Sequence, residues 1–261
     1  MLTIVTALPW EADRFTQRLR GRRHTALGDG WAIWGTHGCV DVRVVVSGPG
    51  LARVRAARSA IESLDPAPTG ILATGAAVGL TDDLRPGHVV IASALLATSI
   101  TSDGSSKNLG ARLKPDDALT TFVKTAAASA GLRSHEGTNI SVDRELLTPA
   151  EKRREHQRSA AIVGQMEDYA WAETAGGLGV PFASGRVILD HVTTSIPAAV
   201  MEWDWQGPRA AEVARSIARR PWLPPSLARL GWQRIRARRS IDRLLESVVQ
   251  LGTPAPGEPA P

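Results

Sequence analysis

The chain has 261 residues and a mass of 27.8 kDa, which is enough for one large α/β domain with a full core. Hydrophobic residues make up 43% of it and charged residues 22%, a composition typical of globular proteins. No run approaches the roughly 18 apolar residues of a membrane span, which excludes a transmembrane protein. The first residues lack the basic start of a signal peptide, and the single cysteine, Cys39, allows no internal disulfide. We therefore expect a cytoplasmic protein.

The net charge of +5 is unevenly distributed along the chain. Ten arginines between Arg209 and Arg243 face only Glu212 and Asp242, a local charge of +8 that leaves the remainder near −3. A nucleic-acid-binding protein is expected to spread basic residues over its folded surface. The sequence instead predicts a mildly acidic body with a basic C-terminal appendage.

Short apolar runs alternate with helical patterns through the first 200 residues. This alternation is typical of an α/β domain with a central mixed or parallel sheet. The predicted strands are Leu2–Leu8, Trp31–His37, Val42–Ser47, Gly70–Ala76, His88–Ala94, Ala160–Gln165 and Pro181–Leu189. The predicted helices are Leu51–Leu64, Ala118–Ala130, Pro149–Ser159 and Asp168–Gly176. The segment Thr98–Pro115 has no clear period and is predicted to be a surface loop.

The pattern changes after Gly207. Two helices are predicted there, divided by the proline-rich segment 221–225, because proline interrupts a helix interior. The second, Ser226–Gln250, is basic and amphipathic. We expect an α/β domain over residues 1–207, a basic helical extension over 208–250 and a disordered tail over 251–261.

A glycine turn, Gly48-Pro49-Gly50, joins a predicted strand to a predicted helix. It is not a dinucleotide-binding fingerprint, because Arg53 occupies the position of the third glycine. Backbone N–H groups at such a turn suit an anion or ribose oxygens. A tight strand–helix turn without a ligand remains the alternative.

Three acidic residues follow predicted strands: Glu11, Glu167 and Asp190. The carboxyl ends of strands line the ligand crevice of open α/β sheets, so these carboxylates are expected to converge there. For any one of them alone, a role as a helix cap or as a partner of an arginine such as Arg14 or Arg186 is a better explanation than catalysis. The histidines lack metal-binding spacing, and we predict neither a metal site nor a cofactor.

The sequence around these acids resembles that of the nucleoside phosphorylase and nucleosidase superfamily. The resemblance is carried by Ala7–Ala12 (ALPWEA), Ser47–Ala57 (SGPGLARVRAA), Thr74–Leu80 (TGAAVGL), Leu84–Ile91 (LRPGHVVI), Met166-Glu167 and Val180–Asp190 (VPFASGRVILD). The break Arg220–Pro225 (RPWLPP) and the arginine-rich helix after it are similar to the hopanoid-associated branch. The resemblance implies cleavage of the N-ribosidic bond of a purine nucleoside.

The resemblance also implies roles for individual residues. Asp190 would protonate the departing adenine or hold its amino group, and Glu167 would bind the ribose and stabilise the ribosyl cation. Glu11 would activate a water molecule. Met166, Gly48, Gly75, Ala76, Val142 and Leu146 would bind the substrate.

Some positions depart from the superfamily pattern. Ala73 and Ala76 stand where phosphorylases carry phosphate-binding side chains, so that phosphate is in doubt as a co-substrate. Glu145 replaces a common aromatic residue, and Asp168 replaces the small residue that often follows Met-Glu. Base recognition or activity is expected to differ accordingly.

The first hypothesis is therefore an enzyme that releases adenine from adenosylhopane. The basic amphipathic segment 208–250 would bring it to an anionic membrane, on the inner face. One alternative is a soluble nucleosidase for methylthioadenosine-like or adenosylhomocysteine-like nucleosides, and another is a non-catalytic nucleic-acid-binding module. We expect a homo-oligomer and no nucleic-acid partner.

Overall fold

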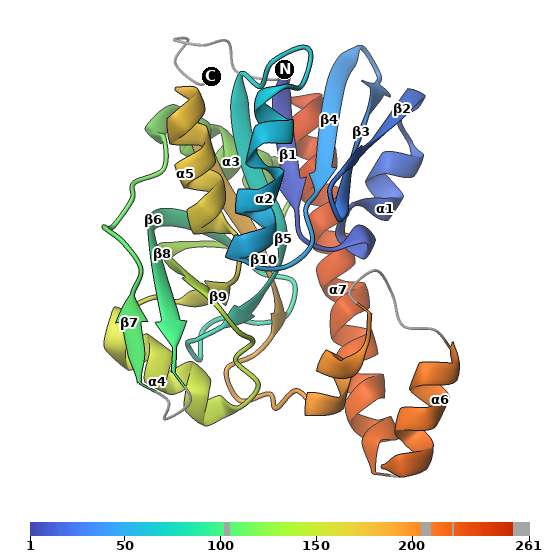
Figure 1. Cartoon of the computed structure of the whole chain (residues 1–261), viewed down its shortest axis with the longest axis vertical. Helices are drawn as coiled ribbons and strands as arrows, with labels where there is room; N and C mark the ends of the chain where they lie inside the picture. Colours follow the sequence, from blue (N-terminus) through green and yellow to red (C-terminus); the bar gives the residue numbers. More distant parts are fainter. Residues whose placement is uncertain (102–104, 205–209, 221, 253–261) are drawn as a thin grey trace.

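The structure of the protein, a computed structural model, describes residues 1–101, 105–204, 210–220 and 222–252 (Figure 1). The strands are β1 (Leu2–Thr6), β2 (Arg20–Leu27), β3 (Gly30–His37), β4 (Val40–Val46), β5 (Gly70–Gly79), β6 (Val89–Ile100), β7 (Ser106–Asn108), β8 (Ser134–Val142), β9 (Val163–Gln165) and β10 (Phe182–Asp190). The helices are α1 (Pro9–Gln17), α2 (Leu51–Glu62), α3 (Asp117–Ser129), α4 (Pro149–Ser159), α5 (Asp168–Leu178), the 3-10 helix η1 (Ala198–Glu202), α6 (Ala210–Arg219) and α7 (Leu223–Gln250).

The strands form one mixed sheet in the order β10-β6-β8-β9-β5-β1-β4-β3-β2, with β7 paired to β6. Strand β1 lies parallel to β4 and β5, whereas β3 is antiparallel to β2 and β4. Strand β10 also pairs with β5, so that β5, β10, β6, β8 and β9 close on themselves. The predicted mixed α/β sheet with flanking helices is confirmed.

Helices cover both faces of the sheet. Alternate side chains of a strand point to opposite faces, and Val44 and Val46 of β4 accordingly belong to one core cluster while Val45 belongs to the other. The first cluster lies under α1, α3 and α7, and the second under α2 and α5 (Figure 1). Strands β1, β5 and β10 are parallel, so their carboxyl ends lie at the same edge of the sheet.

Several predicted elements differ from those observed. The predicted strand Ala160–Gln165 is too long: β9 holds only its last three residues, since Ala160 ends α4 with a left-handed φ of 55°. The expected loop Thr98–Pro115 contains the end of β6 and the strand β7, which is antiparallel to it. Strands β2 and β8 and helix α1 were not predicted.

The C-terminal helix α7 has two different halves. Its second half is part of the main core through Ala237, Ile241, Leu244, Leu245, Val248 and Val249. Its first half leaves the body together with α6 (Figure 1). Helix α7 begins at Leu223, earlier than predicted, because prolines are tolerated in a first helical turn. The division of the chain at residue 207 stays a prediction, and the expected tail from residue 253 onward lies outside the described residues.

Among the described helices, none is both long and apolar enough to cross a bilayer.

Candidate active site

Glu11 lies in the first turn of α1, directly after β1, and its side chain turns back toward the strand end. Its Oε2 accepts hydrogen bonds from the N–H groups of Ala7 (3.0 Å) and Leu8 (2.9 Å), and its Oε1 accepts one from Ala76 (2.7 Å). Only 1% of the residue is exposed. Three backbone donors from two strand ends thus hold one buried carboxylate.

Gly75 makes room for this carboxylate. Its φ of 127° is disfavoured for residues with a side chain, and a Cβ atom there would lie 2.6 Å from Glu11 Oε2. The predicted substrate-binding residues Gly75 and Ala76 therefore contact Glu11 directly.

The surroundings of Glu11 bring the pKa of its carboxyl group close to neutral pH. Burial raises the pKa of Glu11 to about 7, although the nearby Arg186 guanidinium and the backbone donors oppose this rise. A carboxylate with such a pKa can accept a proton at physiological pH.

Glu167 lies at the start of α5, immediately after β9. Its Oε1 accepts a hydrogen bond from the N–H of Gly50 (3.0 Å), and its Oε2 forms an ion pair with Arg186 Nη2 (3.1 Å). The glycine turn 48–50 thus directs an N–H group at a carboxylate of the protein itself. Burial raises the pKa of Glu167, and Arg186 opposes the rise.

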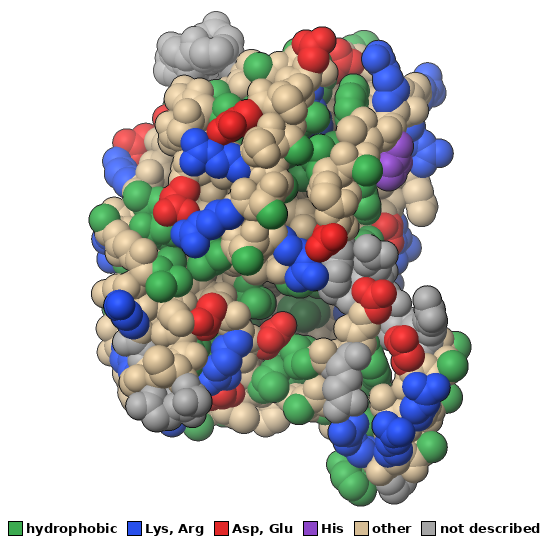
Figure 2. Space-filling model, in the orientation of Figure 1, with side chains coloured by type: hydrophobic (Ala, Val, Ile, Leu, Met, Phe, Trp, Pro, Cys, Tyr) green, Lys and Arg blue, Asp and Glu red, His purple; other side chains and the backbone are tan. Residues whose placement is uncertain are grey.

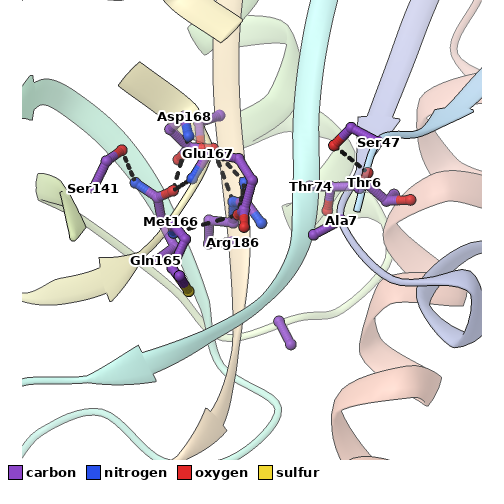
Figure 3. A network of polar contacts seen from close by, with 12 residues as sticks. Thr6, Ala7, Ser47, Thr74, Ser141, Gln165, Met166, Glu167, Asp168 and Arg186 are labelled. Atoms are coloured by element: carbon purple, nitrogen blue, oxygen red, sulfur yellow. Dashed lines mark hydrogen bonds and ion pairs between the residues drawn. The ribbon is translucent and has the colours of Figure 1, made fainter. Parts of the chain in front are cut away.

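Arg186 of β10 forms an ion pair with Glu167 and lies near enough to Glu11 to affect its pKa. It is paired with Asp168, whose Oδ1 accepts from Nε (2.9 Å) and Nη2 (2.6 Å), while Ser184 Oγ donates to Asp168 Oδ2 (2.6 Å). Figure 3 shows Glu167 and Asp168 next to each other, both beside Arg186. Its remaining nitrogen, Nη1, is buried without a hydrogen-bond partner in the described structure. Asp168, which we expected to alter base recognition, is therefore a partner of Arg186.

Gln165 fixes the start of α5. Its Oε1 accepts from the N–H groups of Glu167 (2.6 Å) and Asp168 (2.8 Å), and its Nε2 donates to Ser141 Oγ (2.7 Å) (Figure 3). These bonds satisfy helix N-terminal donors that have no partner within the helix. Sequence reasoning missed Gln165, because a glutamine at a strand end carries no distinctive signal.

Asp190 ends β10, where the register of β10 against β5 shifts. It is 2% exposed, and its Oδ2 forms an ion pair with the ammonium of Lys152, from α4. Burial raises the pKa of Asp190, and Lys152 opposes the rise. Asp190 lies four residues beyond Arg186, about 13 Å along an extended strand. Its ion pair is with Lys152 and not with the Arg186 group of side chains.

The predicted apolar contacts come together beside Glu167. Val142 and Leu146 are buried in one small cluster, and Met166 packs against it. Met166 also approaches Gly50, since its Cε would lie 3.9 Å from a Cβ there. Gly48 donates its N–H to the Ala7 carbonyl (3.0 Å) and belongs to the turn itself. Glu145 is exposed and does not join this cluster.

The described residues contain no cluster of three or more His, Cys, Asp or Glu side chains suited to a metal ion.

Comparison with known proteins places this arrangement in a family. A curated relative, the 5'-methylthioadenosine/S-adenosylhomocysteine nucleosidase of Shewanella sediminis, is 28% identical over 170 residues, 61% of this chain and 74% of the relative.

Solved structures share the fold. The 5'-methylthioadenosine/S-adenosylhomocysteine nucleosidase of Neisseria meningitidis has a TM-score of 0.73 at 18% identity, covering 95% of this chain and 98% of that one. Futalosine hydrolase of Helicobacter pylori has a TM-score of 0.71 at 16% identity, with 95% and 97% covered. The profile described as Phosphorylase superfamily matches residues 2–220. The protein therefore belongs to the phosphorylase superfamily and is an enzyme of the nucleosidase or phosphorylase type, as its sequence predicts.

Proposed function

We propose that the protein hydrolyses the N-ribosidic bond of an adenine nucleoside. The observation that carries this proposal is the position of Glu11, which fills a nest of three backbone N–H groups beside Arg186 and Glu167. Asp190, on the same strand as Arg186, supplies a second carboxyl group, which we assign to the purine. The names of the nucleosidase relatives support an adenine nucleoside as the substrate class.

The reaction has three steps, and we assign one residue to each step. The electron pair of the N-ribosidic bond moves to the purine, which takes a proton from Asp190. The ribosyl cation that remains is stabilised by the carboxylate of Glu167. A water molecule attacks the cation, and Glu11 takes its proton, which its pKa of about 7 permits.

Water is favoured over phosphate as the attacking group. The N–H of Ala76 belongs to the turn where phosphorylases bind phosphate, and here it donates to Glu11. A phosphate ion would find that donor already occupied and would meet a carboxylate of like charge. The small side chains of Ala73 and Ala76 provide no further donors.

The test is an adenine-release assay with adenosine and methylthioadenosine, with and without inorganic phosphate, followed by identification of the sugar. We expect adenine release at the same rate in both conditions and an unphosphorylated sugar, which is ribose from adenosine and methylthioribose from methylthioadenosine. Release that requires phosphate and yields a sugar 1-phosphate would contradict hydrolysis.

For the non-purine half of the substrate, we propose adenosylhopane, a nucleoside joined to a lipid. The observation that favours it is the protruding part of the molecule formed by α6 and the first half of α7, where Trp222 is 70% exposed, Trp232 57% and Ile235 53%. Basic side chains gather on the same part (Figure 2). Such a surface suits an anionic membrane, where a lipid-linked nucleoside resides.

A small soluble nucleoside such as methylthioadenosine remains the second candidate, favoured by the names of the relatives. Comparing adenine release from adenosylhopane in vesicles with release from methylthioadenosine separates the two. A higher kcat/KM for methylthioadenosine would reject the lipid-linked substrate. Membership of an enzyme superfamily favours both over the non-catalytic nucleic-acid-binding alternative.

A further inference from the structure

Lys152 is a fully buried lysine on an otherwise polar helix. It lies in the first turns of α4, none of its surface is exposed, and α4 is anchored by the capping pair Thr148 and Glu151. Lysine is almost never fully buried unless its charge is paired. Its burial therefore requires a partner inside the protein.

The ammonium of Lys152 is completely satisfied. It donates to Asp190 Oδ2, to the carbonyl of Thr194 (2.6 Å) and to the carbonyl of His191 (3.3 Å). An ammonium has three N–H donors, and each has an acceptor here. The three bonds fix both the carboxylate and the turn that follows β10.

This arrangement leaves one oxygen of Asp190 for a ligand. Oδ2 is bound to Lys152, and no described residue donates a hydrogen bond to Oδ1. The other charged or titratable neighbours of Asp190 are His191, beside it in the chain, and Arg229 of α7, which donates to Thr194 Oγ1 (3.1 Å).

We propose that Lys152 is a positioning residue of the reaction, which directs Asp190 Oδ1 at the leaving purine and stabilises the carboxylate that forms as the proton is transferred. In this step the O–H bond at Oδ1 breaks and an N–H bond forms on the purine. The electron pair of the N-ribosidic bond passes to the purine ring, and the new negative charge on Asp190 lies next to the ammonium. The inference rests on the proposed function.

Burial alone would make Asp190 a poor acid. Burial raises the pKa of this carboxyl, whereas a neighbouring cation favours its ionised form. A general acid acts best when its proton can leave near the working pH. Lys152 supplies the charge that makes this transfer favourable.

The test compares two leaving groups in Lys152→Met. Adenine needs a proton to leave, whereas 4-nitrophenol leaves 4-nitrophenyl riboside as a stable anion. We expect kcat for adenosine to fall about 100-fold, in the range typical of general-acid contributions, and kcat for the nitrophenyl riboside to fall far less. Equal losses on both substrates would overturn the proposal, because damage to the fold does not discriminate between leaving groups.

Matched variants keep the test decisive. Arg153→Met removes the adjacent, exposed cation of α4, which pairs with Asp82, and should retain the wild-type ratio of the two rates.

Asp190→Asn and the double variant Lys152→Met/Asp190→Asn should have equal rates with adenosine, since Lys152 acts through Asp190. This pair also decides the matter if Lys152→Met does not fold, and a slower double variant would overturn the proposal. Failure of the wild type to release adenine would instead reject the proposed function.

Discussion

Glu11 shows how a single buried side chain sets the working pH of the site. The carboxylate is the active form of a general base, and its pKa is about 7. We predict that kcat/KM for adenosine rises with pH through about 7, because Glu11 then loses its proton. Initial rates between pH 5 and 9 measure this rise of kcat/KM, which is the acidic limb of the pH profile.

The variant Glu11→Gln should lose this pH limb together with most of the activity. An amide also places an N–H group against the backbone donors of Ala7, Leu8 or Ala76, which costs about 1–3 kcal/mol of stability. Thermal unfolding of the variant must therefore accompany the rates. A limb that persists in a folded Glu11→Gln protein would assign the titration to another group.

Gly75 offers a second prediction at the scale of one residue. Gly75→Ala should displace Glu11, because the new Cβ would lie 2.6 Å from its Oε2. We expect kcat/KM to fall at least about 10-fold, as small displacements of catalytic groups have large effects.

The matched control is Gly38→Ala. Gly38 also has a positive φ, 62°, but nothing lies within 4 Å of its Cβ position. Both variants carry backbone strain, and only Gly75→Ala carries the collision. Equal kinetic effects in the two variants would show that contact with Glu11 is not the cause.

At the scale of elements, a strand could be predicted from the sequence only where its residues form a hydrophobic pattern. The run of valines in β4 identifies that strand, because a strand whose successive residues enter two core clusters is apolar on both faces. Strand β2 was missed, since all of its residues except Leu27 are exposed and an edge strand of this kind has no apolar face. The positions of Glu11 and Glu167 followed from strand ends, which local sequence does show.

Contacts between distant elements could not be predicted in the same way. Lys152 stands in a polar helical segment, KRREHQR, that has the composition of a solvated surface. Its partner Asp190 is 38 residues away. Likewise, the bond from Arg186 to Asp168 depends on the packing of α5 against β10. Such pairs become apparent only when the sheet brings its strands and helices together.

Helix α7 yields a prediction about stability. Leu245→Ala should reduce the free energy of unfolding by about 2–5 kcal/mol, because Leu245 is completely buried in the main core. Ile235→Ala, on the same helix, should cost about 1 kcal/mol or less, since 53% of Ile235 is exposed. Denaturant unfolding measures both. Equal costs would contradict the division of α7 into a core half and an exposed half.

The same packing governs truncation. Removal of residues 208–261 takes away Ile241, Leu244 and Leu245 together with their core contacts. We therefore expect the truncated chain to be insoluble or unfolded. The role of the exposed half of α7 must be tested by point substitutions in the full chain.

At the scale of the whole molecule, charge and exposed aromatic groups are concentrated on one protruding part. Trp222 and Trp232 are exposed near the start of α7, and the arginines of α6 and α7 give the same region its positive charge. Tryptophan favours the membrane interface, and each basic residue near an anionic surface contributes about 1 kcal/mol. Both features favour contact with an anionic lipid surface.

We predict that the intact chain sediments with vesicles containing anionic lipid at low salt and is released as salt rises, because the Debye length falls to about 8 Å at physiological ionic strength. Neutral vesicles should bind far less protein. Trp222→Ala/Trp232→Ala keeps every charge and should weaken binding without altering hydrolysis of a soluble adenosine analogue. If the intact chain fails to sediment with anionic vesicles at low salt, the membrane contact is rejected, and small soluble nucleosides become the favoured substrates.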